Sequence, residues 1–274
     1  MTSPPVSNPP VSNPAIGSPD FSSPVFSNQV SARFSRQAHN YAHQARLQQG
    51  VAWRLAHLCA PLPVPEGPRA DLGAGSGLVG QALDNQGEPR ALLQLDLCAE
   101  LLAHNPLAGA GREVVWDLNQ GLPQALQQAA LLTSSFALQW LEAPATQLQH
   151  WCGALCPGGW LALAVPTAAS FPQWHRAAAA AGVPCTALPL PQADVLLAAA
   201  RSGGLELRHC RRLTFSRAYG SGLGFLQQLK TLGANASRAR RLNPDQLRRL
   251  LNCWPGHGRV SWEVLVLLGQ RRER

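Results

Sequence analysis

The sequence predicts an α/β protein in which helices cover both faces of a largely parallel sheet. Short apolar runs of strand length alternate with segments whose apolar residues recur at helical spacing. A glycine-rich turn follows the first of these runs, and the 274 residues are enough for one large domain of this kind. We therefore expect a Rossmann-like, doubly wound sheet of seven strands, with an α-helical insertion before the last strand.

The first 30 residues differ in composition from the rest of the chain. They repeat Pro, Ser, Asn and Val and contain no Lys or Arg. Such a segment cannot bury enough apolar surface to offset the entropy lost on ordering, so we expect a disordered tail over 1–30 and one folded domain over 31–274. The basic start of a secretory signal and the arginines of a transit peptide are both missing, which predicts a cytoplasmic protein.

The order of elements in the domain follows from apolar spacing and from proline and glycine. Helical spacing predicts an amphipathic helix over 34–60, which Pro61, Pro63 and Pro65 end. The expected core strands are a run ending at Leu72, then 91–97, 112–118, 130–138 and 160–165, and two last strands near 204–209 and 260–268. A helix is expected over 143–156. Helical insertions over about 170–200 and 218–255 are expected to build an acceptor site.

Charge and cysteine content narrow the classes of partner and cofactor. The net charge of +8 and the pI near 9.7 indicate an acidic partner, such as nucleic acid, anionic lipid or an acidic protein. Because the chain shows no aromatic-interleaved RNA-binding motif and no apolar run of membrane-spanning length, we expect neither a nucleic-acid nor a membrane partner. The seven cysteines include no Cys-x-x-Cys pair, so we expect reduced thiols and no metal.

The turn DLGAGSG (71–77) is the first element that indicates a ligand. It places Asp71 at the end of a strand and Gly73, Gly75 and Gly77 in the turn, where glycine permits positive φ and lets a ligand approach bare backbone. Asp96 ends the second strand, at the position of a ribose-binding carboxylate. Because the loop also matches Gly-x-Gly-x-x-Gly, it fits either NAD or S-adenosylmethionine.

Three further features favour S-adenosylmethionine. Asp117 ends the third strand, where it could accept a hydrogen bond from an adenine amino group, and we place Leu97 and Leu118 in the same site. The segment LCPGGWLAL (155–163) is a helix end, a Pro-Gly-Gly reversal and a strand, an element widespread in methyltransferases. A helix before the first strand could close over the cofactor, whereas dehydrogenases usually begin with the strand.

Eight stretches of the chain carry a more specific resemblance. They are FSRQAHNYAHQARLQ (34–48), DLGAGSG, FALQW (136–140), LCPGGWLAL, SFPQWHRA (170–177), LQQLKTLGAN (226–235), LNPDQLRRL (242–250) and VSWEVLVLLG (260–269). Together they resemble the malonyl-acyl-carrier-protein O-methyltransferases of biotin synthesis, within the class I methyltransferase superfamily. The chain departs from that family at Ala130, where Asp is usual, at Ser135, where Asn is common, and near 185–191, where an Asn-Arg-Phe segment is missing.

The resemblance implies methyl transfer from S-adenosylmethionine to the free carboxylate of malonyl-acyl-carrier protein, which gives an ester that primes pimelate and biotin synthesis. A malonyl carboxylate is ionised at neutral pH, so we expect no general base. The negative charge of this carboxylate and the positive charge on the sulfur of S-adenosylmethionine both disappear when the methyl group is transferred. A pocket that excludes water favours such a reaction. Tyr41, Gln139 and Trp140 are then expected to position the reactants, and Arg176 and Lys230 are candidate partners of the malonyl carboxylate.

Basic residues gather after residue 200. The clusters are Arg208, Arg211 and Arg212, then Arg238, Arg240 and Arg241, and then Arg248 and Arg249. Acyl-carrier proteins are strongly acidic, so we interpret these clusters as a docking surface of a monomeric enzyme. Two alternatives stay open: a class I methyltransferase that acts on another carboxylate or small molecule, and a non-catalytic basic binding module that keeps the fold.

Overall fold

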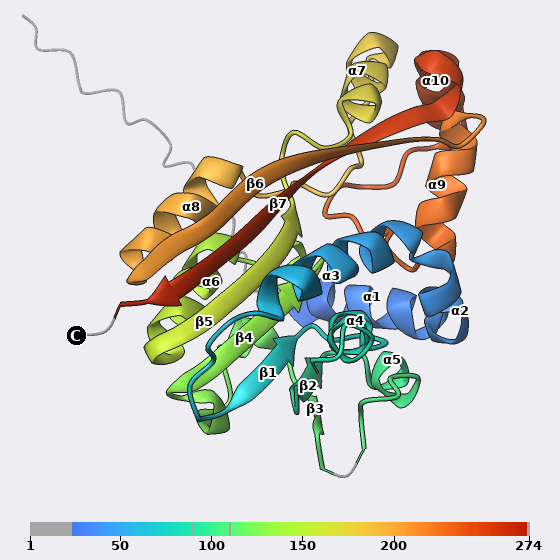
Figure 1. Ribbon diagram of the computed structural model, residues 1–274. Helices are drawn as coiled ribbons and strands as arrows, with labels where there is room; N and C mark the ends of the chain where they lie inside the picture. The colour runs from blue at the N-terminus through green and yellow to red at the C-terminus, as the bar shows by residue number, and fades with distance from the viewer. Residues whose placement is uncertain (1–23, 89, 110, 273–274) are drawn as a thin grey trace, which may run out of the picture.

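The computed structural model describes residues 24–272 except residues 89 and 110. A seven-stranded sheet forms the centre, in the order β3-β2-β1-β4-β5-β7-β6, and β7 runs antiparallel to both of its neighbours. The strands are β1 (Arg69–Leu72), β2 (Leu93–Asp96), β3 (Glu113–Val115), β4 (Ala129–Ser135), β5 (Leu155–Pro166), β6 (Leu205–Ala218) and β7 (Arg259–Arg271). The predicted doubly wound α/β class is confirmed (Figure 1).

Helices cover both faces of this sheet. They are α1 (Pro24–Ser35), α2 (Ala38–Gln44), α3 (Arg46–Cys59), α4 (Leu78–Asp84), α5 (Ala99–Ala103), α6 (Pro144–Ala154), α7 (Pro172–Ala181), α8 (Ala193–Ser202), α9 (Gly222–Thr231) and α10 (Pro244–Asn252). Helices α3 and α4 pack on one face, and α6 and α8 pack on the other. In β5 the even-numbered residues from Trp160 to Ala164 belong to the first core, and the odd-numbered residues from Leu161 to Val165 belong to the second. No helix in the described part of the chain has the length and hydropathy needed to cross a membrane.

The strand order creates a crevice at one edge of the sheet. From β1 the chain proceeds to β2 and β3 on one side, and the next strand, β4, lies on the other side of β1. Loops after β1 and β4 therefore diverge at their carboxyl ends, which is where open α/β sheets bind ligands. The pairing register places Asp71 of β1 opposite Thr133 of β4 and Gln94 of β2.

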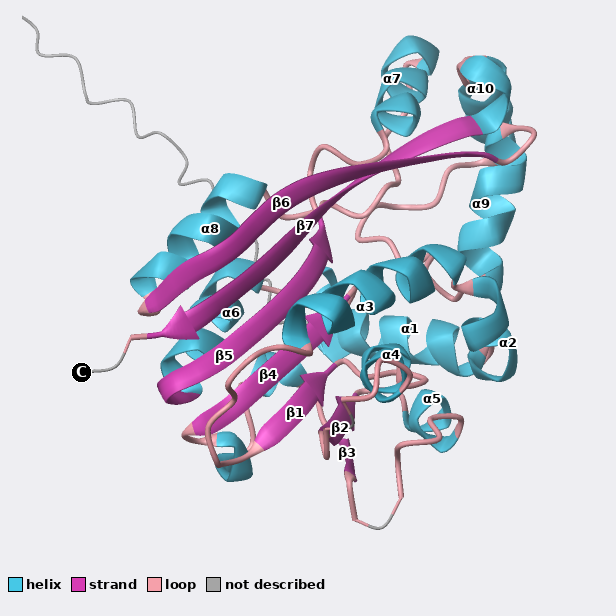
Figure 2. Cartoon of the chain, in the orientation of Figure 1, coloured by secondary structure: helices cyan, strands magenta, loops and turns pink. Residues whose placement is uncertain are grey.

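The antiparallel pair of β6 and β7 extends beyond the parallel strands (Figure 2), and α9 and α10 lie in the connection between its two strands. Both strands are longer than the expected 204–209 and 260–268. The outer part of β6 is an exposed sheet edge, and its many polar residues hide the strand from a search for apolar runs. Helices α7, α9 and α10 lie together at the far end of this antiparallel pair (Figure 1).

Helix α8 differs from its expected role in an acceptor-site insertion. It packs against α6 and β6, within the layer on the second face of the sheet. Its buried residues, Ala193, Leu196, Leu197 and Ala200, have the spacing of a helix that lies on a sheet. The insertion at the far end of the antiparallel pair of β6 and β7 therefore consists of α7, α9 and α10.

The predicted boundary between tail and domain at residues 30 and 31 falls inside α1. Phe26 and Val30 of this helix are buried in a cluster with Ala236, so this part of the expected tail is helical and packed rather than disordered. The four-residue spacing of Phe26, Val30 and Phe34 is a helical signal that the Pro- and Ser-rich composition hid. The rest of the expected tail lies outside the described residues.

The single helix expected over 34–60 is divided among α1, α2 and α3. The chain leaves helical geometry after Ser35 and again at Ala45, where ψ is 46°. Neither break carries Pro or Gly, so turn residues did not indicate it. As a result α1 and α2 are separate helices rather than the beginning of α3. They contact α5, which follows the carboxyl end of β2.

Candidate active site

The turn between β1 and α4 brings backbone to a pocket at the crevice. Gly73, Gly75 and Gly77 have φ values of 72°, 53° and 79°, a region that side chains disfavour. A Cβ on Gly73 would lie 2.1 Å from Ala137 Cβ, and one on Gly77 would lie 2.2 Å from Asn105 Oδ1. Gly73 and Gly75 line the pocket, whereas Gly77 begins α4. The loop thus forms a cradle that side chains would fill.

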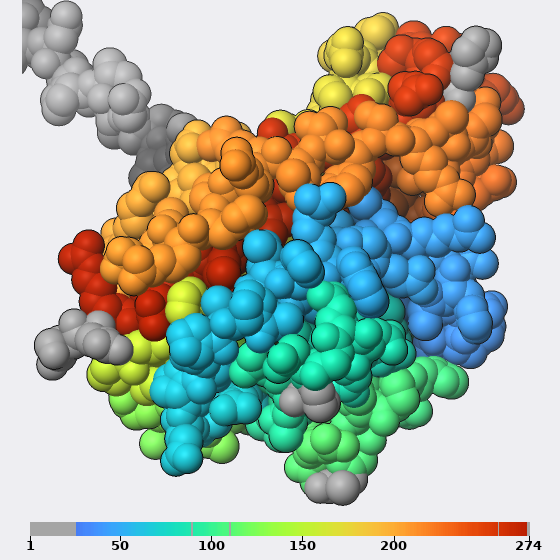
Figure 3. All heavy atoms as spheres, viewed as in Figure 1, coloured from blue at the N-terminus to red at the C-terminus, as the bar shows by residue number. Residues whose placement is uncertain are grey.

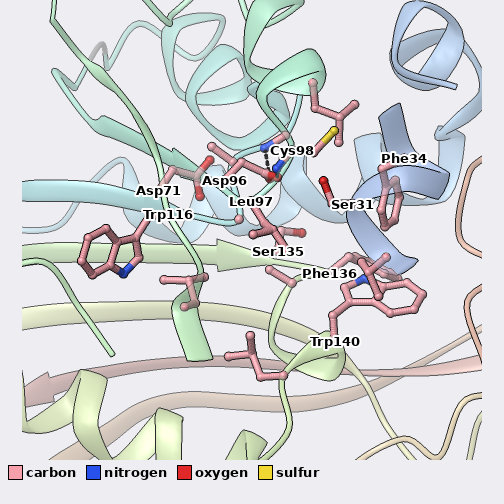
Figure 4. Close-up of a pocket in the computed structure, with 18 of the residues that line it drawn as sticks. Ser31, Phe34, Asp71, Asp96, Leu97, Cys98, Trp116, Ser135, Phe136 and Trp140 are labelled. Carbon is pink, nitrogen blue, oxygen red and sulfur yellow. Dashed lines mark hydrogen bonds between the residues drawn. The ribbon is translucent and has the colours of Figure 1, made fainter. Parts of the chain in front are cut away.

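Asp96 lies beside this loop at the end of β2 and, with Leu97, lines the same pocket (Figure 4). Its Oδ2 accepts a hydrogen bond from Gly75 N and its Oδ1 accepts one from Cys98 N, each at 2.8 Å. Burial raises the pKa of this carboxyl to about 6, and the backbone donors act in the opposite direction. Since each carboxylate oxygen can accept a further bond, Asp96 is oriented for a ligand with hydroxyl donors, such as a ribose.

Asp71 is a buried carboxyl that the protein leaves half satisfied. Its Oδ1 accepts a hydrogen bond from Thr133 Oγ1 at 2.8 Å, while its Oδ2 has no partner among the described residues. Burial raises the pKa of Asp71 to about 7, the Thr133 bond lowers it and the nearby Asp96 raises it. An orphan carboxylate oxygen that lines a pocket suits a ligand with a cationic amino group.

The residues after β3 form another wall of this pocket. Asp117 Oδ1 accepts hydrogen bonds from N and Nδ2 of Asn119, both at 2.9 Å, and so caps a short 3-10 turn. Trp116 and Leu118 line the pocket on either side of Asp117. These flat and apolar groups beside a carboxylate acceptor fit an adenine ring with its amino group.

Helix α1 covers the pocket and is held at several points. It contributes the lining residues Ser27, Val30, Ser31 and Phe34. Asn119 Nδ2 donates a hydrogen bond to Ser27 Oγ at 3.1 Å, and the Arg238 guanidinium lies 3.9 Å from the ring centroid of Phe26. Gly233, which follows α9, has φ of 71°, and a Cβ there would lie 2.7 Å from a carbonyl oxygen of α1. In the space-filling view the N-terminal helices adjoin the insertion directly (Figure 3).

A second cavity of about 660 Å³ adjoins the first, a size typical of small-molecule sites. The two cavities share the lining residues Phe34, Tyr41, Gln48, Phe136 and Trp140, and we call this set the junction. All of the junction residues are uncharged. The Phe34 ring packs edge to face on Tyr41 and on Trp140, with centroid distances of 5.8 and 5.6 Å. A group that moves from one cavity to the other must pass these side chains.

The predicted positioning residues lie together near this junction. Tyr41 and Trp140 belong to it, and Gln139 and Lys230 line the second cavity. Burial, with a smaller effect from Asp96, raises the pKa of Tyr41, so its phenol stays protonated and can donate a hydrogen bond.

Arg176 lies away from both cavities. It is exposed, its Nε donates to Pro172 O at 3.2 Å, and it is absent from the lining of either cavity. Helix α7 buries Trp174, Ala177 and Ala178, which turns Arg176 outward. Arg176 is therefore not placed to contact a malonyl group in the second cavity.

Phe136 shows backbone strain at the centre of the junction. Its φ is 56°, a conformation that costs a non-glycine residue on the order of 1–3 kcal/mol. Gln139 holds the turn, because its Nε2 donates a hydrogen bond of 2.6 Å to Phe136 O, and Phe136 N donates to Ala164 O at 2.9 Å. Gln139 thus acts on the site by positioning Phe136.

Sequence analysis missed several lining residues. Gln48 is buried in α3 on the same helical face as Val51 and Leu55, so a glutamine at a core-facing position was the available signal. Ser135 Oγ is buried beside the first cavity and has no hydrogen-bond partner in the part of the chain that the structure describes. The second cavity is also lined by Arg33 and Arg36, which no local pattern marked, and by Arg241, which was predicted to belong to a docking surface instead.

Comparison with known proteins defines the class. Residues 70–163 match the family model described as a methyltransferase domain. A putative methyltransferase from Bacillus halodurans has a TM-score of 0.56 at 14% identity, over 80% of this chain and 98% of that one. A geranyl diphosphate methyltransferase in complex with S-adenosylmethionine has a TM-score of 0.50 at 12% identity, over 83% of this chain and 86% of that one. The fold, the glycine cradle and the carboxylates define a class I methyltransferase that uses S-adenosylmethionine.

Curated relatives give the family. A malonyl-acyl-carrier-protein O-methyltransferase from Magnetococcus marinus is 31% identical over 251 residues, which are 86% of this chain and 90% of that one. The biotin biosynthesis bifunctional protein of Bordetella avium is 32% identical over 238 residues, 84% of this chain. The chain spans about half of that bifunctional relative, 49% of its length. The chain belongs to the malonyl-acyl-carrier-protein O-methyltransferase family and is an O-methyltransferase.

Proposed function

We propose that the protein transfers the methyl group of S-adenosylmethionine to the free carboxylate of a malonyl group on acyl-carrier protein. The product is a methyl ester that enters pimelate and biotin synthesis. The observation that carries this proposal is the second cavity, which adjoins the cofactor pocket through an uncharged junction and has cations among the lining residues that the two cavities do not share. The names of the curated relatives agree with this substrate.

Different residues of the first cavity would bind different parts of the cofactor. Asp96 would accept hydrogen bonds from the ribose hydroxyls, and the orphan Oδ2 of Asp71 would accept one from the amino group. Asp117 and the apolar groups beside it would hold the adenine. When bound, the cofactor supplies a methyl group on a positively charged sulfur. The residues of the chain orient this group and exclude water from it.

The acceptor needs alignment rather than activation. A malonyl carboxylate is already ionised at neutral pH, so no side chain has to remove a proton. The reaction cancels a negative and a positive charge, so an uncharged junction stabilises the transition state relative to the separated ions. The protonated Tyr41 hydroxyl can donate to one carboxylate oxygen and leave the other free to attack.

The test is intact-mass measurement of malonyl-acyl-carrier protein after incubation with the enzyme and S-adenosylmethionine. We expect a mass gain that corresponds to one methyl group replacing one proton, and none with acetyl-acyl-carrier protein, which lacks the carboxylate. Equal methylation of both carriers, or of neither, would contradict the proposal. Methylation of a free dicarboxylate alone would favour a different acceptor on the same fold.

A further inference from the structure

The positive charge in the second cavity is unevenly distributed. Arg33, Arg36, Lys230 and Arg241 line this cavity, but none of them belongs to the junction. Within the described residues, no Asp or Glu lines the second cavity. The positive charge of the cavity therefore comes from walls that the cofactor pocket does not share, and we call these four residues its cationic part.

The arginines of this cationic part are close to one another and form no ion pair with any residue that the structure describes. The pKa of Arg33 is lowered by burial first, and then by the charges of Arg241 and Arg36. Arg33 Nε is buried without a hydrogen-bond partner in the part of the chain that the structure describes. Elsewhere the exposed Arg208 and Arg248 pair with Glu206 and Asp245, but no such ion pair is formed by the arginines of the cavity within the described residues. Clustered like charges without a counter-charge indicate an anionic ligand.

The reacting carboxylate is not the anion that this cluster suits best. Its charge disappears as the ester bond forms, so adjacent arginines would stabilise the ground state more than the transition state. A phosphate keeps its charge throughout the reaction. Binding it lowers KM without opposing the chemical step, and arginine binds phosphate oxygens through paired donors.

We propose that Arg33, Arg36 and Arg241 bind the phosphate of a phosphopantetheine arm, while the junction receives the acyl carboxylate at the other end of that arm. This inference rests on the proposed function, because it assumes an acyl group delivered on such an arm. The cavity of about 660 Å³ is larger than a malonyl group requires. Leu226, Leu229 and Leu242 line it and offer apolar contacts to the geminal methyl groups of pantetheine.

A binding experiment tests the inference without depending on methyl transfer. Phosphopantetheine and pantetheine are titrated into the enzyme with S-adenosylhomocysteine present, and calorimetry gives both affinities. We expect the wild type to prefer phosphopantetheine by roughly tenfold to hundredfold, the size of charge-assisted hydrogen bonds. Arg33→Gln and Arg241→Gln should each remove most of this preference. Arg240→Gln is the matched control, since Arg240 is exposed and lines neither cavity, and it should keep the preference.

The outcomes separate the two proposals. If wild type and variants bind the two compounds equally, the inference is wrong even if malonyl-acyl-carrier protein is methylated. If the preference is present but malonyl substrates are not methylated, the phosphate site stands and the acyl group is another one. Unaltered thermal melting of Arg33→Gln and Arg241→Gln shows that a lost preference is not a loss of folding.

Kinetics with malonyl thioesters distinguish the sources of the phosphate. Coenzyme A and the carrier protein both present a phosphopantetheine arm, so Arg33→Gln should raise KM for both by a similar factor. A loss of kcat with no rise in KM would show that the arginine acts in the chemical step rather than in binding the arm, and would overturn the assignment.

Discussion

Burial determines the charge of Asp71 and so makes cofactor binding depend on pH. Its pKa is raised from 3.8 to about 7, so the folded protein keeps a proton that the unfolded chain loses above about pH 4. This contribution to the free energy of unfolding is fully present below the unfolded pKa and is lost as pH rises through about 7. The apoprotein is therefore expected to become less stable across this window, as far as Asp71 is concerned.

The cationic amino group of S-adenosylmethionine favours the ionised form of Asp71. We expect the affinity for the cofactor to rise as pH increases from about 6 to about 7.5, by up to roughly tenfold per pH unit for a single group, with release of a proton. Calorimetry in two buffers of different ionisation enthalpy measures this release. Asp71→Asn can still accept from Thr133 and should bind the cofactor more weakly, with less proton release. Equal release by both proteins would show that another group titrates.

At the residue scale, the predictable part of the site is the part that is local in sequence. Asp71 and Asp96 lie at the carboxyl ends of strands and the glycines follow β1 directly, so apolar runs and a short motif were enough to place them. Gln48 and Arg33 come from helices that meet the site only through tertiary packing. Arg176 was selected because it lies in the segment SFPQWHRA. The buried residues of α7 lie on a face of the helix that does not include Arg176, so its side chain points outward.

At the scale of elements, the contact between α1 and the chain after α9 can be tested with a pair of glycines. Gly233→Ala places a Cβ 2.7 Å from a carbonyl oxygen of α1, at a φ of 71°. Gly182→Ala introduces similar strain, at a φ of 59°, but has open space around the added Cβ. Both substitutions should cost about 1–2 kcal/mol of unfolding free energy from backbone strain. Gly233→Ala should cost more and should also weaken cofactor binding, because α1 lines that pocket.

Chemical denaturation and calorimetry with S-adenosylmethionine measure these two effects. Equal losses of stability with unchanged cofactor affinity in both variants would show that α1 does not depend on its contact with Gly233.

The elements that were predicted well are the buried strands. β4 and β5 contain continuous apolar runs, 129–132 and 160–165, because both of their faces are covered. The outer half of β6 is an exposed edge, so its length follows from pairing with β7 rather than from composition. The breaks in the N-terminal helix carry no proline or glycine, and packing against α5 determines the new direction of the chain there.

For the molecule as a whole, the structure changes the interpretation of the basic clusters. Arg238 lies over the Phe26 ring and Arg241 lines the second cavity, so neither is a simple surface charge. Helix α10 offers a better docking surface for an acidic carrier. It presents Leu247 and Leu250 to the cavity and exposes Arg248 and Arg249. A carrier seated on these arginines would have the cavity beside its arm.

Reversal of charge at Arg248 and Arg249 to Glu should raise KM for malonyl-acyl-carrier protein and leave KM for malonyl-coenzyme A nearly unchanged. The effect on the carrier should shrink as salt approaches about 0.5 M, because exposed charges act through encounter rate and are screened. The same reversal at Arg54 and Arg201, exposed on α3 and α8 and outside the basic clusters, serves as the control. Steady-state kinetics with both substrates measure these KM values. If the two double variants change them alike, the carrier docks elsewhere.

The contact of α1 with Gly233 also bears on how the chain folds during synthesis. The helix that covers the cofactor pocket is among the first described segments to be made, yet the backbone on which it rests lies about 200 residues later. A nascent chain that has completed β5 has the glycine loop, both acidic side chains of the cradle and the contacts of α1 with α5 and Asn119, but α1 still lacks its contacts with Gly233 and Ala236. We therefore expect the cofactor to reach its full stabilising effect only after α9 and the segment that follows it have been made.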